Sequence, residues 1–293
     1  MNTQRSRATL IGIGAVLLWA LLALFTAGSD AVPPLQLVAM SFLVAFLIAV
    51  ALWTVQRRNP LRRLRQPPAA WALGVLGLFG YHAMYFLALR TAPVVDASLI
   101  AYLWPLLIVL FSAMLPGERL RWFHLCGAVL GFAGAVLIVS RGGFGFASLS
   151  GGYFAAMACA LIWSGYSVLN RRFPQVPTDA VGGFCGVTAV LAFALHLGLE
   201  QTVWPETALQ WLAVVGLGLG PVGGAFFLWD HGTKHGDIRV LGASAYLAPL
   251  ISTVILMAAR EADPTWRIGL ACLLITGGAA LAAKEMLRRR RPA

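Results

Sequence analysis

Ala101-Tyr-Leu-Trp-Pro-Leu106 and Ala245-Tyr-Leu-Ala-Pro-Leu250 are two copies of one pattern, with Tyr246 lying 144 positions after Tyr102. Each copy places a proline and a ring hydroxyl inside an apolar run, where both are unfavourable. The same offset of 144 relates other residues: Trp19 and Trp163, Gly74 and Gly218, Gly80 and Gly224, Trp122 and Trp266, and Gly134 and Gly278. The sequence therefore contains an internal repeat, with two copies of one unit.

The composition predicts an integral membrane protein. The 293 residues are 59% hydrophobic and 11% charged, with a mean hydropathy of +0.79, more apolar than a soluble domain of this size requires. No cleavable signal is expected, because the first apolar run after Arg7 is long enough to span and lacks a small-residue cleavage site. Ten runs are predicted to span the bilayer as helices: 8–26, 33–55, 69–89, 97–115, 121–140, 152–170, 179–199, 208–229, 240–259 and 265–284.

The charge distribution predicts the topology of these spans. The net charge of +11 does not indicate nucleic acid, because the basic residues cluster between apolar runs. Of the 22 Lys and Arg residues, 18 fall on the side that holds both termini, so both termini are expected in the cytoplasm. Five spans per unit is an odd number, so the second unit enters the membrane in the opposite sense. We expect one transmembrane domain with repeat 1 at 1–140, a linker at 141–150 and repeat 2 at 151–293, an arrangement that places a site near the midplane.

Ionisable side chains are expected at span ends and in loops. This holds for every Asp and Glu, including Asp230 and Asp237, and no Lys or Arg is predicted within a span. The absence of an embedded carboxylate argues against proton-coupled antiport, and the absence of an embedded cation argues against an anionic substrate. The expected substrate is neutral or zwitterionic and its transport facilitative. No metal, cofactor or disulfide is predicted, since the four cysteines lie in apolar runs without metal-ligand spacing.

Aromatic residues supply the candidate binding site. Most tryptophans, including Trp53 and Trp229, lie near span ends, where an interfacial belt is expected. Trp19 and Trp163 instead fall about 16 Å into their spans, at the midplane of the bilayer. The predicted substrate-binding residues are Trp19, Tyr81, His82, Tyr85, Tyr102, Trp104, Trp163, Tyr166 and Tyr246. Their alternative role is core packing, with ring donors bonded to backbone.

Other features also allow two interpretations. His82 is the one mid-span ionisable side chain, and it either contacts the cavity or packs as a neutral, hydrogen-bonded ring. Glycines and prolines allow either a hinge or static close packing of helices, with their free carbonyls as possible ammonium acceptors. The predicted hinge or kink residues are Gly80, Pro105, Gly220, Pro221, Gly224 and Pro249. Glu118, beside Arg119 and Arg121, is either a weak surface ion pair or part of a gate.

Taken together, these residues resemble the EamA branch of the drug/metabolite transporter superfamily. The resemblance covers the whole chain and includes the mid-span tryptophans, the fourth-span prolines and Gly-Glu-Arg-Leu at 117–120 before Trp122. Within that branch, Tyr81, His82 and Tyr85, with the stretch 232–250, are similar to bacterial exporters of aromatic amino acids. The resemblance implies export of aromatic and other neutral amino acids through a central cavity by alternating access.

Two rival functions follow from the same sequence. The first is a transporter of the same fold that carries another small metabolite or drug; the protein is expected to be a monomer. The second is a membrane scaffold whose repeat serves packing alone. An enzyme is not expected, because the spans contain no grouping of nucleophile, base and orienting residue, and no catalytic residue is assigned.

Overall fold

The computed structural model describes residues 3–139, 151–258 and 265–284, and the regular secondary structure of these residues is entirely helical. The predicted linker at 141–150 and the basic run at 288–291 lie outside this description. The helices and helical turns have the following bounds: α1 Thr3–Trp19, α2 Leu22–Ala27, α3 Pro34–Val55, α4 Pro60–Leu64, α5 Pro68–Val75, η1 Leu76–Gly80, α6 Tyr81–Thr91, α7 Val94–Ala101, α8 Trp104–Phe111, η2 Ser112–Met114, α9 Trp122–Val139, α10 Gly151–Leu169, η3 Asn170–Arg172, η4 Thr178–Ala180, α11 Val181–Leu199, α12 Ala208–Leu219, η5 Gly220–Gly224, α13 Ala225–His235, α14 Ile238–Ser244, α15 Leu247–Ala258 and α16 Trp266–Ala282.

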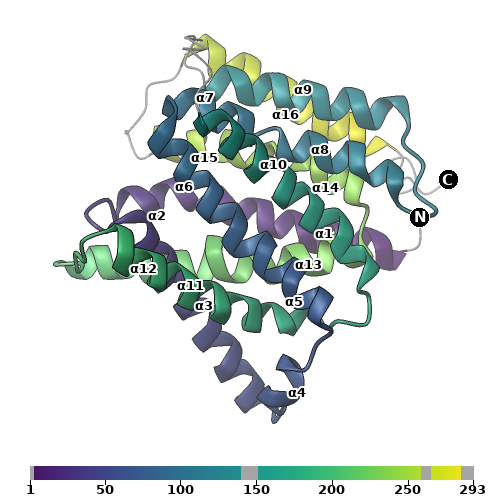
Figure 1. Cartoon of the computed structure of the whole chain (residues 1–293). Coiled ribbons are helices and arrows are strands. Elements are labelled where there is room, and N and C mark those ends of the chain that lie inside the picture. The colour runs from purple at the N-terminus through teal and green to yellow at the C-terminus, as the bar shows by residue number, and fades with distance from the viewer. Residues whose placement is uncertain (1–2, 140–150, 259–264, 285–293) are drawn as a thin grey trace.

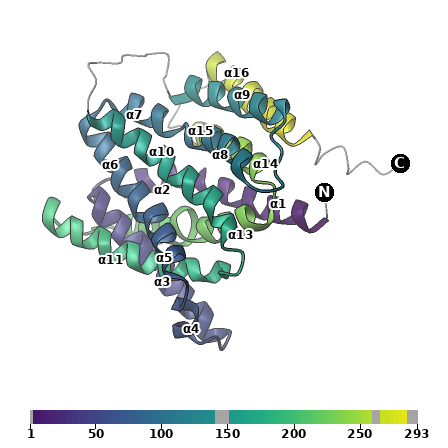
Figure 2. The same ribbon diagram turned by 45° about the vertical axis from the view of Figure 1, so that its right-hand side comes forward.

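The helices form one bundle in which most elements run roughly along a common direction (Figure 1). Within the described residues, eight helical segments are long and apolar enough to cross a membrane, and two shorter apolar helices cover 122–137 and 266–282. These ten segments correspond to the ten predicted runs. The prediction of an all-helical membrane protein is therefore confirmed in the described part of the chain. The start of α1 and the end of α16 lie at the same end of the bundle in both ribbon views (Figures 1 and 2).

Two spans are interrupted by a π-helical turn. The turn η1 separates α5 from α6, and η5 separates α12 from α13, with bounds that differ by the offset of 144. In η5, Pro221 has no N–H to donate to the preceding turn, which favours the wider π spacing. In η1, Gly77 lets the Tyr166 ring approach, since a Cβ at Gly77 would lie 2.5 Å from Tyr166 Cγ. The predicted hinge residues Gly80, Gly220, Pro221 and Gly224 all lie in these turns.

The fourth and ninth predicted spans are also broken, each at the tyrosine of the repeated pattern. Tyr102 and Leu103 separate α7 from α8, and Ala245 and Tyr246 separate α14 from α15. Pro105 lies in the first turn of α8, where a missing N–H does no harm, and Pro249 is the third residue of α15. The two copies of the opening pattern thus form equivalent breaks.

Helices of the first half of the chain pack mainly on helices of the second half. The extensively packed pairs are α9 with α16, α3 with α11, α1 with α13, and α6 with α10. The α9–α16 contact depends on glycine, because a Cβ at Gly127 would lie 2.5 Å from the Gly278 carbonyl oxygen, and the reverse substitution meets the Gly127 oxygen at the same distance. Such close approach is how membrane helices gain packing energy without a hydrophobic driving force.

The outer surface is largely apolar, as a lipid-facing surface requires. Trp122, Trp204, Trp211 and Trp266 are exposed near helix ends, in agreement with the predicted aromatic belt. Trp53 differs from that prediction, because its side chain is buried against Gly182 of α11. Gly182 has no Cβ, which leaves room for the indole, so the α3–α11 packing explains this buried position.

Candidate functional site

Four tryptophans from four helices meet in the interior of the bundle. Trp19 ends α1, Trp104 begins α8, Trp163 lies on α10 and Trp229 lies on α13. The ring of Trp19 lies 5.9 Å from Trp104, 5.8 Å from Trp163 and 5.0 Å from Trp229, measured between centroids. These distances suit edge-to-face and tilted aromatic pairing. The four rings are called the tryptophan cluster below.

Trp229 was predicted at the interface, and that prediction is wrong, because the side chain is fully buried. The physical reason is that the helical span continues past the predicted end at 229. The interrupted helix runs from Ala208 to His235, a length of 28 residues that includes the π-turn η5. Trp229 therefore lies more than a turn inside the helix end and faces the cluster.

The indole N–H groups of the cluster fall into two kinds. Trp19 donates to the Pro221 carbonyl at 3.0 Å, and Trp229 donates to Ser167 Oγ at 3.0 Å. Within the part of the chain that the structure describes, the N–H groups of Trp104 and Trp163 have no hydrogen-bond partner. The Pro221 carbonyl is therefore occupied by Trp19 rather than open to a ligand. Two donors of the cluster remain available for a polar partner.

Further aromatic side chains extend the cluster on one side. Tyr81 lies 5.4 Å from Trp163 and stacks on Tyr85 with centroids 6.0 Å apart. Phe226 contacts Trp163 at 5.6 Å and stacks on Phe42 at 5.6 Å. The sequence did not single out these two phenylalanines, because an apolar ring in a span carries no signal that separates a cavity wall from packing.

Two predicted polar side chains adjoin these rings. His82 places Nδ1 2.7 Å from the Leu78 carbonyl, so the proton on that nitrogen is the donor and Nε2 points elsewhere. Tyr166 packs 5.2 Å from Trp163, and its buried hydroxyl has no hydrogen-bond partner among the described residues. An unpaired buried hydroxyl is unfavourable, so Tyr166 is a further group that a polar ligand can satisfy.

The two tyrosines of the repeated pattern lie in different environments. Tyr102 is partly exposed at the break between α7 and α8. Tyr246 is fully buried, with its ring 6.2 Å from Phe132 and against Gly131 of α9, and its hydroxyl donates to the Tyr102 carbonyl at 3.1 Å. The structure thus places Tyr246 away from the tryptophan cluster, where it joins the two breaks. The Pro249 carbonyl is also occupied, by Thr253 Oγ1 at 2.8 Å.

A buried ion pair directly follows Trp229 on α13. Asp230 and Lys234 are four residues apart on α13, with Nζ and Oδ1 separated by 2.9 Å and both side chains almost fully buried. Asn170 donates to Asp230 Oδ1 at 2.8 Å, and Thr178 donates to Oδ2 at 2.7 Å. Both residues lie in the last two turns of α13, at the span end where they were expected, but they are buried in the protein rather than exposed there. The continuation of α13 to His235 draws both charges into the protein, where each neutralises the other.

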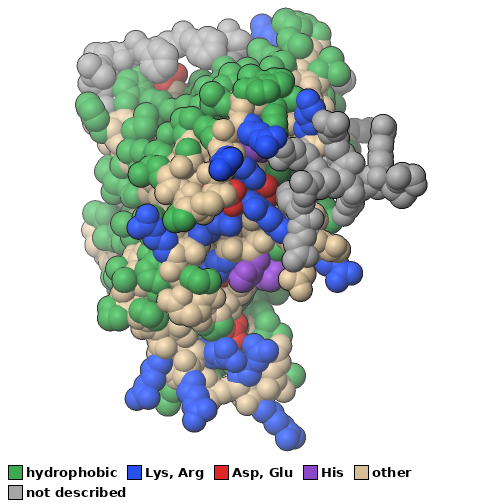
Figure 3. All heavy atoms as spheres, turned by 90° about the vertical axis from the view of Figure 1, so that its right-hand side faces the viewer, with side chains coloured by type: hydrophobic (Ala, Val, Ile, Leu, Met, Phe, Trp, Pro, Cys, Tyr) green, Lys and Arg blue, Asp and Glu red, His purple; other side chains and the backbone are tan. Residues whose placement is uncertain are grey.

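A second ionic group closes the end of the bundle that Figure 3 faces, where acidic side chains lie among many basic ones. Glu118, whose side chain is 6% exposed, lies 2.6 Å from Arg5, 3.2 Å from Arg171 and 3.3 Å from Arg239. These arginines come from α1, η3 and α14. Gly117 has a φ of 77°, a conformation that suits glycine and turns Glu118 back toward the bundle. Glu118 with its three arginines is called the Glu118 cluster below.

Asp237 joins the Glu118 cluster from the loop before α14. It lies 2.7 Å from Arg239 and 3.4 Å from Arg5. Burial raises the pKa of Asp237, but hydrogen bonds and the charge of Arg239, together with Arg5, outweigh it and hold that pKa below its ordinary value. The carboxylate is therefore ionised at neutral pH. No group of three or more potential metal ligands occurs among the described residues.

Comparisons with known proteins find similarity over nearly the whole chain. The model of the EamA-like transporter family matches the chain twice, over residues 6–140 and 150–283. The aromatic amino acid exporter YddG of Ancylobacter novellus is 53% identical over 290 residues, which cover 98% of this chain and 100% of that protein. The YddG of Escherichia coli is 24% identical over 94% of this chain and 97% of its own length. A crystal structure with 50% sequence identity superposes with a TM-score of 0.92, covering 98% of this chain and 100% of the other.

Proposed function

This chain belongs to the EamA-like transporter family, and from that premise we propose that it exports aromatic and other neutral amino acids by alternating access. It is a multi-pass membrane protein and a transporter, not an enzyme. The observation that carries the substrate class is the 53% identity, over nearly the full length, to an exporter of aromatic amino acids. The tryptophan cluster supplies a chemical reason for that class.

The proposed architecture is ten spans in two inverted repeats, at 1–140 and 151–293, joined by the linker at 141–150. The two separate matches to the family model support it. So do the two π-turns at equivalent positions and the packing of α1 on α13 and α6 on α10, which are equivalent pairs under the same offset. The basic residues near the termini favour the cytoplasmic side of the inner membrane for both ends. The transporter is proposed to act as a monomer in the lipid bilayer.

The proposed binding site comprises the tryptophan cluster and the side chains around it. An aromatic substrate ring stacks with indoles and phenols, which supplies about 0.5–1.5 kcal/mol for each well-placed pair. The unpaired N–H groups of Trp104 and Trp163 suit a substrate carboxylate, and tryptophan faces attract its ammonium group. The proposed residues are Trp19, Tyr81, His82, Tyr85, Tyr102, Trp104, Trp163 and Tyr166, with Phe226 and Trp229 added from their positions. Tyr246 is left out because it packs elsewhere.

Transport is proposed to be facilitative. The Asp230–Lys234 pair is neutral as a whole, and Asn170 and Thr178 donate to its carboxylate, so it is poorly suited to carry a proton. His82 donates through Nδ1 to a backbone carbonyl and serves as a neutral polar wall of the site. The proposed hinges are the π-turns η1 and η5 and the breaks beside Pro105 and Pro249, since π-turns often mark functional sites.

The test is flux into liposomes that contain the purified protein. Labelled phenylalanine, tryptophan and threonine are supplied with and without a pH gradient, and empty liposomes give the background. The proposal requires saturable flux of the aromatic substrates in both conditions. Absence of flux for every amino acid contradicts the substrate class, whereas flux that requires the pH gradient contradicts facilitative transport alone.

Replacing Trp163 by alanine is expected to reduce phenylalanine flux about tenfold, because an indole that contacts Trp19, Trp104 and Tyr81 is lost from the site. Expression and membrane insertion are expected to persist. The matched control is Trp122→Ala, since that indole is 65% exposed on α9, and this variant is expected to transport normally. Equal flux in the two variants would show that Trp163 serves packing rather than substrate binding.

A further inference from the structure

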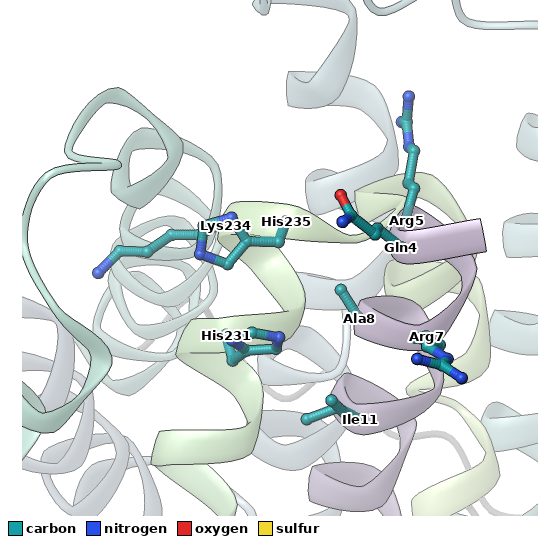
Figure 4. A pocket seen from close by; sticks show the side chains of 8 residues that line it. All are labelled: Gln4, Arg5, Arg7, Ala8, Ile11, His231, Lys234 and His235. Carbon is teal, nitrogen blue, oxygen red and sulfur yellow. The ribbon is translucent and has the colours of Figure 1, made fainter. Parts of the chain in front are cut away.

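A pocket of about 700 Å³ opens between α1 and the last turns of α13, apart from the tryptophan cluster. Figure 4 shows its two walls: His231 and His235 on α13 face the α1 side chains of Gln4, Ala8 and Ile11. On both helices these residues are spaced at three to four positions, so each wall is one helical stripe. The helices meet at one flank of the pocket, where a Cβ at Gly232 would lie 2.5 Å from Gly12 Cα.

The pocket is lined by basic side chains. Its lining includes Arg5, Arg7, His231, Lys234 and His235, and no carboxylate occurs among the lining residues. Arg5 and Lys234 are already neutralised, by Glu118 and Asp230 respectively. Figure 4 agrees, because the Lys234 side chain points away from the space between the helices.

The remaining basic groups are free to take a ligand. Among the described residues, Arg7, His231 and His235 form no hydrogen bond or ion pair, and the two imidazole rings lie 4.9 Å apart. Arg7 contributes a permanent charge, and each imidazole contributes an N–H donor. This combination fits a phosphate group.

The other half of the pocket is apolar and continues along the outside of α1. Ile11 lines the pocket and is 40% exposed, and Leu10 and Leu17 are exposed on the same helix. Both α1 and α13 belong to segments apolar enough to span the membrane, and α13 ends at His235. The basic part of the pocket therefore lies at the depth of lipid headgroups, with apolar surface running toward the acyl chains.

We propose that this pocket binds an anionic phospholipid of the leaflet at the end of the bundle where α1 begins. Its phosphate contacts Arg7, His231 and His235, and one acyl chain follows Ile11 along α1. Basic pockets between transmembrane helices are the kind of site that binds anionic headgroups. A bound lipid holds α1 against α13, the helix that carries Trp229 and the Asp230–Lys234 pair. The lipid proposal does not depend on the proposed amino acid substrate, so an experiment can contradict either one without the other.

The test is native mass spectrometry of the purified full-length protein with phosphatidylglycerol, phosphatidylcholine or inorganic phosphate. Preferential retention of one phosphatidylglycerol is expected. Arg7→Gln is expected to weaken that retention about fivefold, the effect of one basic residue near an anionic surface. His231→Phe with His235→Phe, which keeps two rings without N–H groups, is expected to act in the same direction. The control Arg62→Gln removes the same charge from an exposed position on the short helix α4 and leaves retention unchanged.

A further variant distinguishes the binding of a lipid from the binding of a free anion. Ile11→Ser is expected to weaken the binding of phosphatidylglycerol without changing the binding of inorganic phosphate, because only the lipid contacts the apolar wall. Equal retention of the two phospholipids by the wild type contradicts the proposal. Binding of inorganic phosphate that displaces the lipid, with no effect of Ile11→Ser, identifies a simple anion site and also contradicts it. An unchanged melting temperature in each variant shows that the fold is intact.

Discussion

Replacing Lys234 by methionine is expected to lower the free energy of unfolding by about 3–5 kcal/mol. The substitution removes the ammonium that lies 2.9 Å from Asp230 and leaves a fully buried carboxylate without its cation. Asn170 and Thr178 still donate to that carboxylate, but their neutral dipoles replace only part of a full charge. The measurement is the thermal and denaturant-induced unfolding of the purified protein in detergent.

Two further variants show whether the loss comes from the broken pair. Lys284→Met is the same substitution at an exposed lysine whose contact is with the Trp122 ring, and it is expected to change stability by about 1 kcal/mol at most. The double variant Asp230→Leu with Lys234→Met removes both charges and is expected to recover much of the loss, because a buried pair is often matched by apolar residues. A Lys234→Met protein as stable as Lys284→Met would show that the pair has no structural role.

Replacing Glu118 by glutamine is expected to open the end of the bundle at which α1 begins. The neutral amide leaves the guanidinium groups of Arg5, Arg171 and Arg239 close together without the carboxylate that they share. Loss of one partner in a buried charged network lowers the stability of the contact between the elements that it joins by about 2–5 kcal/mol. Hydrogen–deuterium exchange is therefore expected to rise in residues 3–9 and 238–244.

The exchange pattern distinguishes a local opening from general destabilisation. The amides at the α9–α16 contact, which does not depend on Glu118, are expected to keep their protection. Glu206→Gln, on an exposed carboxylate, serves as the matched control and is expected to leave every region unchanged. If exchange rises equally throughout the Glu118→Gln protein, the Glu118 cluster supports the whole fold rather than closing one end.

The sequence was sufficient to predict the helical membrane fold and part of the candidate site. Apolar length identifies helices in a bilayer because every backbone polar group must be paired within the segment. Depth in a span singled out Trp19 and Trp163, since indoles normally lie at the interface. Both lie in the tryptophan cluster, and whether they bind substrate stays a prediction.

Other parts of the site depend on features that no local pattern specifies. Trp229 was assigned to the interface because the π-turn η5 and the continuation of α13 lengthen that span beyond its apolar run. Asp230 and Lys234 did offer a signal, as opposite charges four residues apart on a helix, but their burial depends on Asn170 from another element. The three arginines around Glu118 lie 113, 53 and 121 positions away, so only the folded chain brings them together.

The pairing of helices across the two halves of the chain has a consequence for biogenesis. The partners of α1, α3 and α9 are α13, α11 and α16, all of which are synthesised later. After the first half has entered the membrane, its glycine faces at Gly12 and Gly127 therefore contact lipid until these later helices arrive. Final assembly must follow insertion of the whole chain, and a ribosome stalled near residue 150 would leave a half-protein with its principal contact surfaces still open to the bilayer.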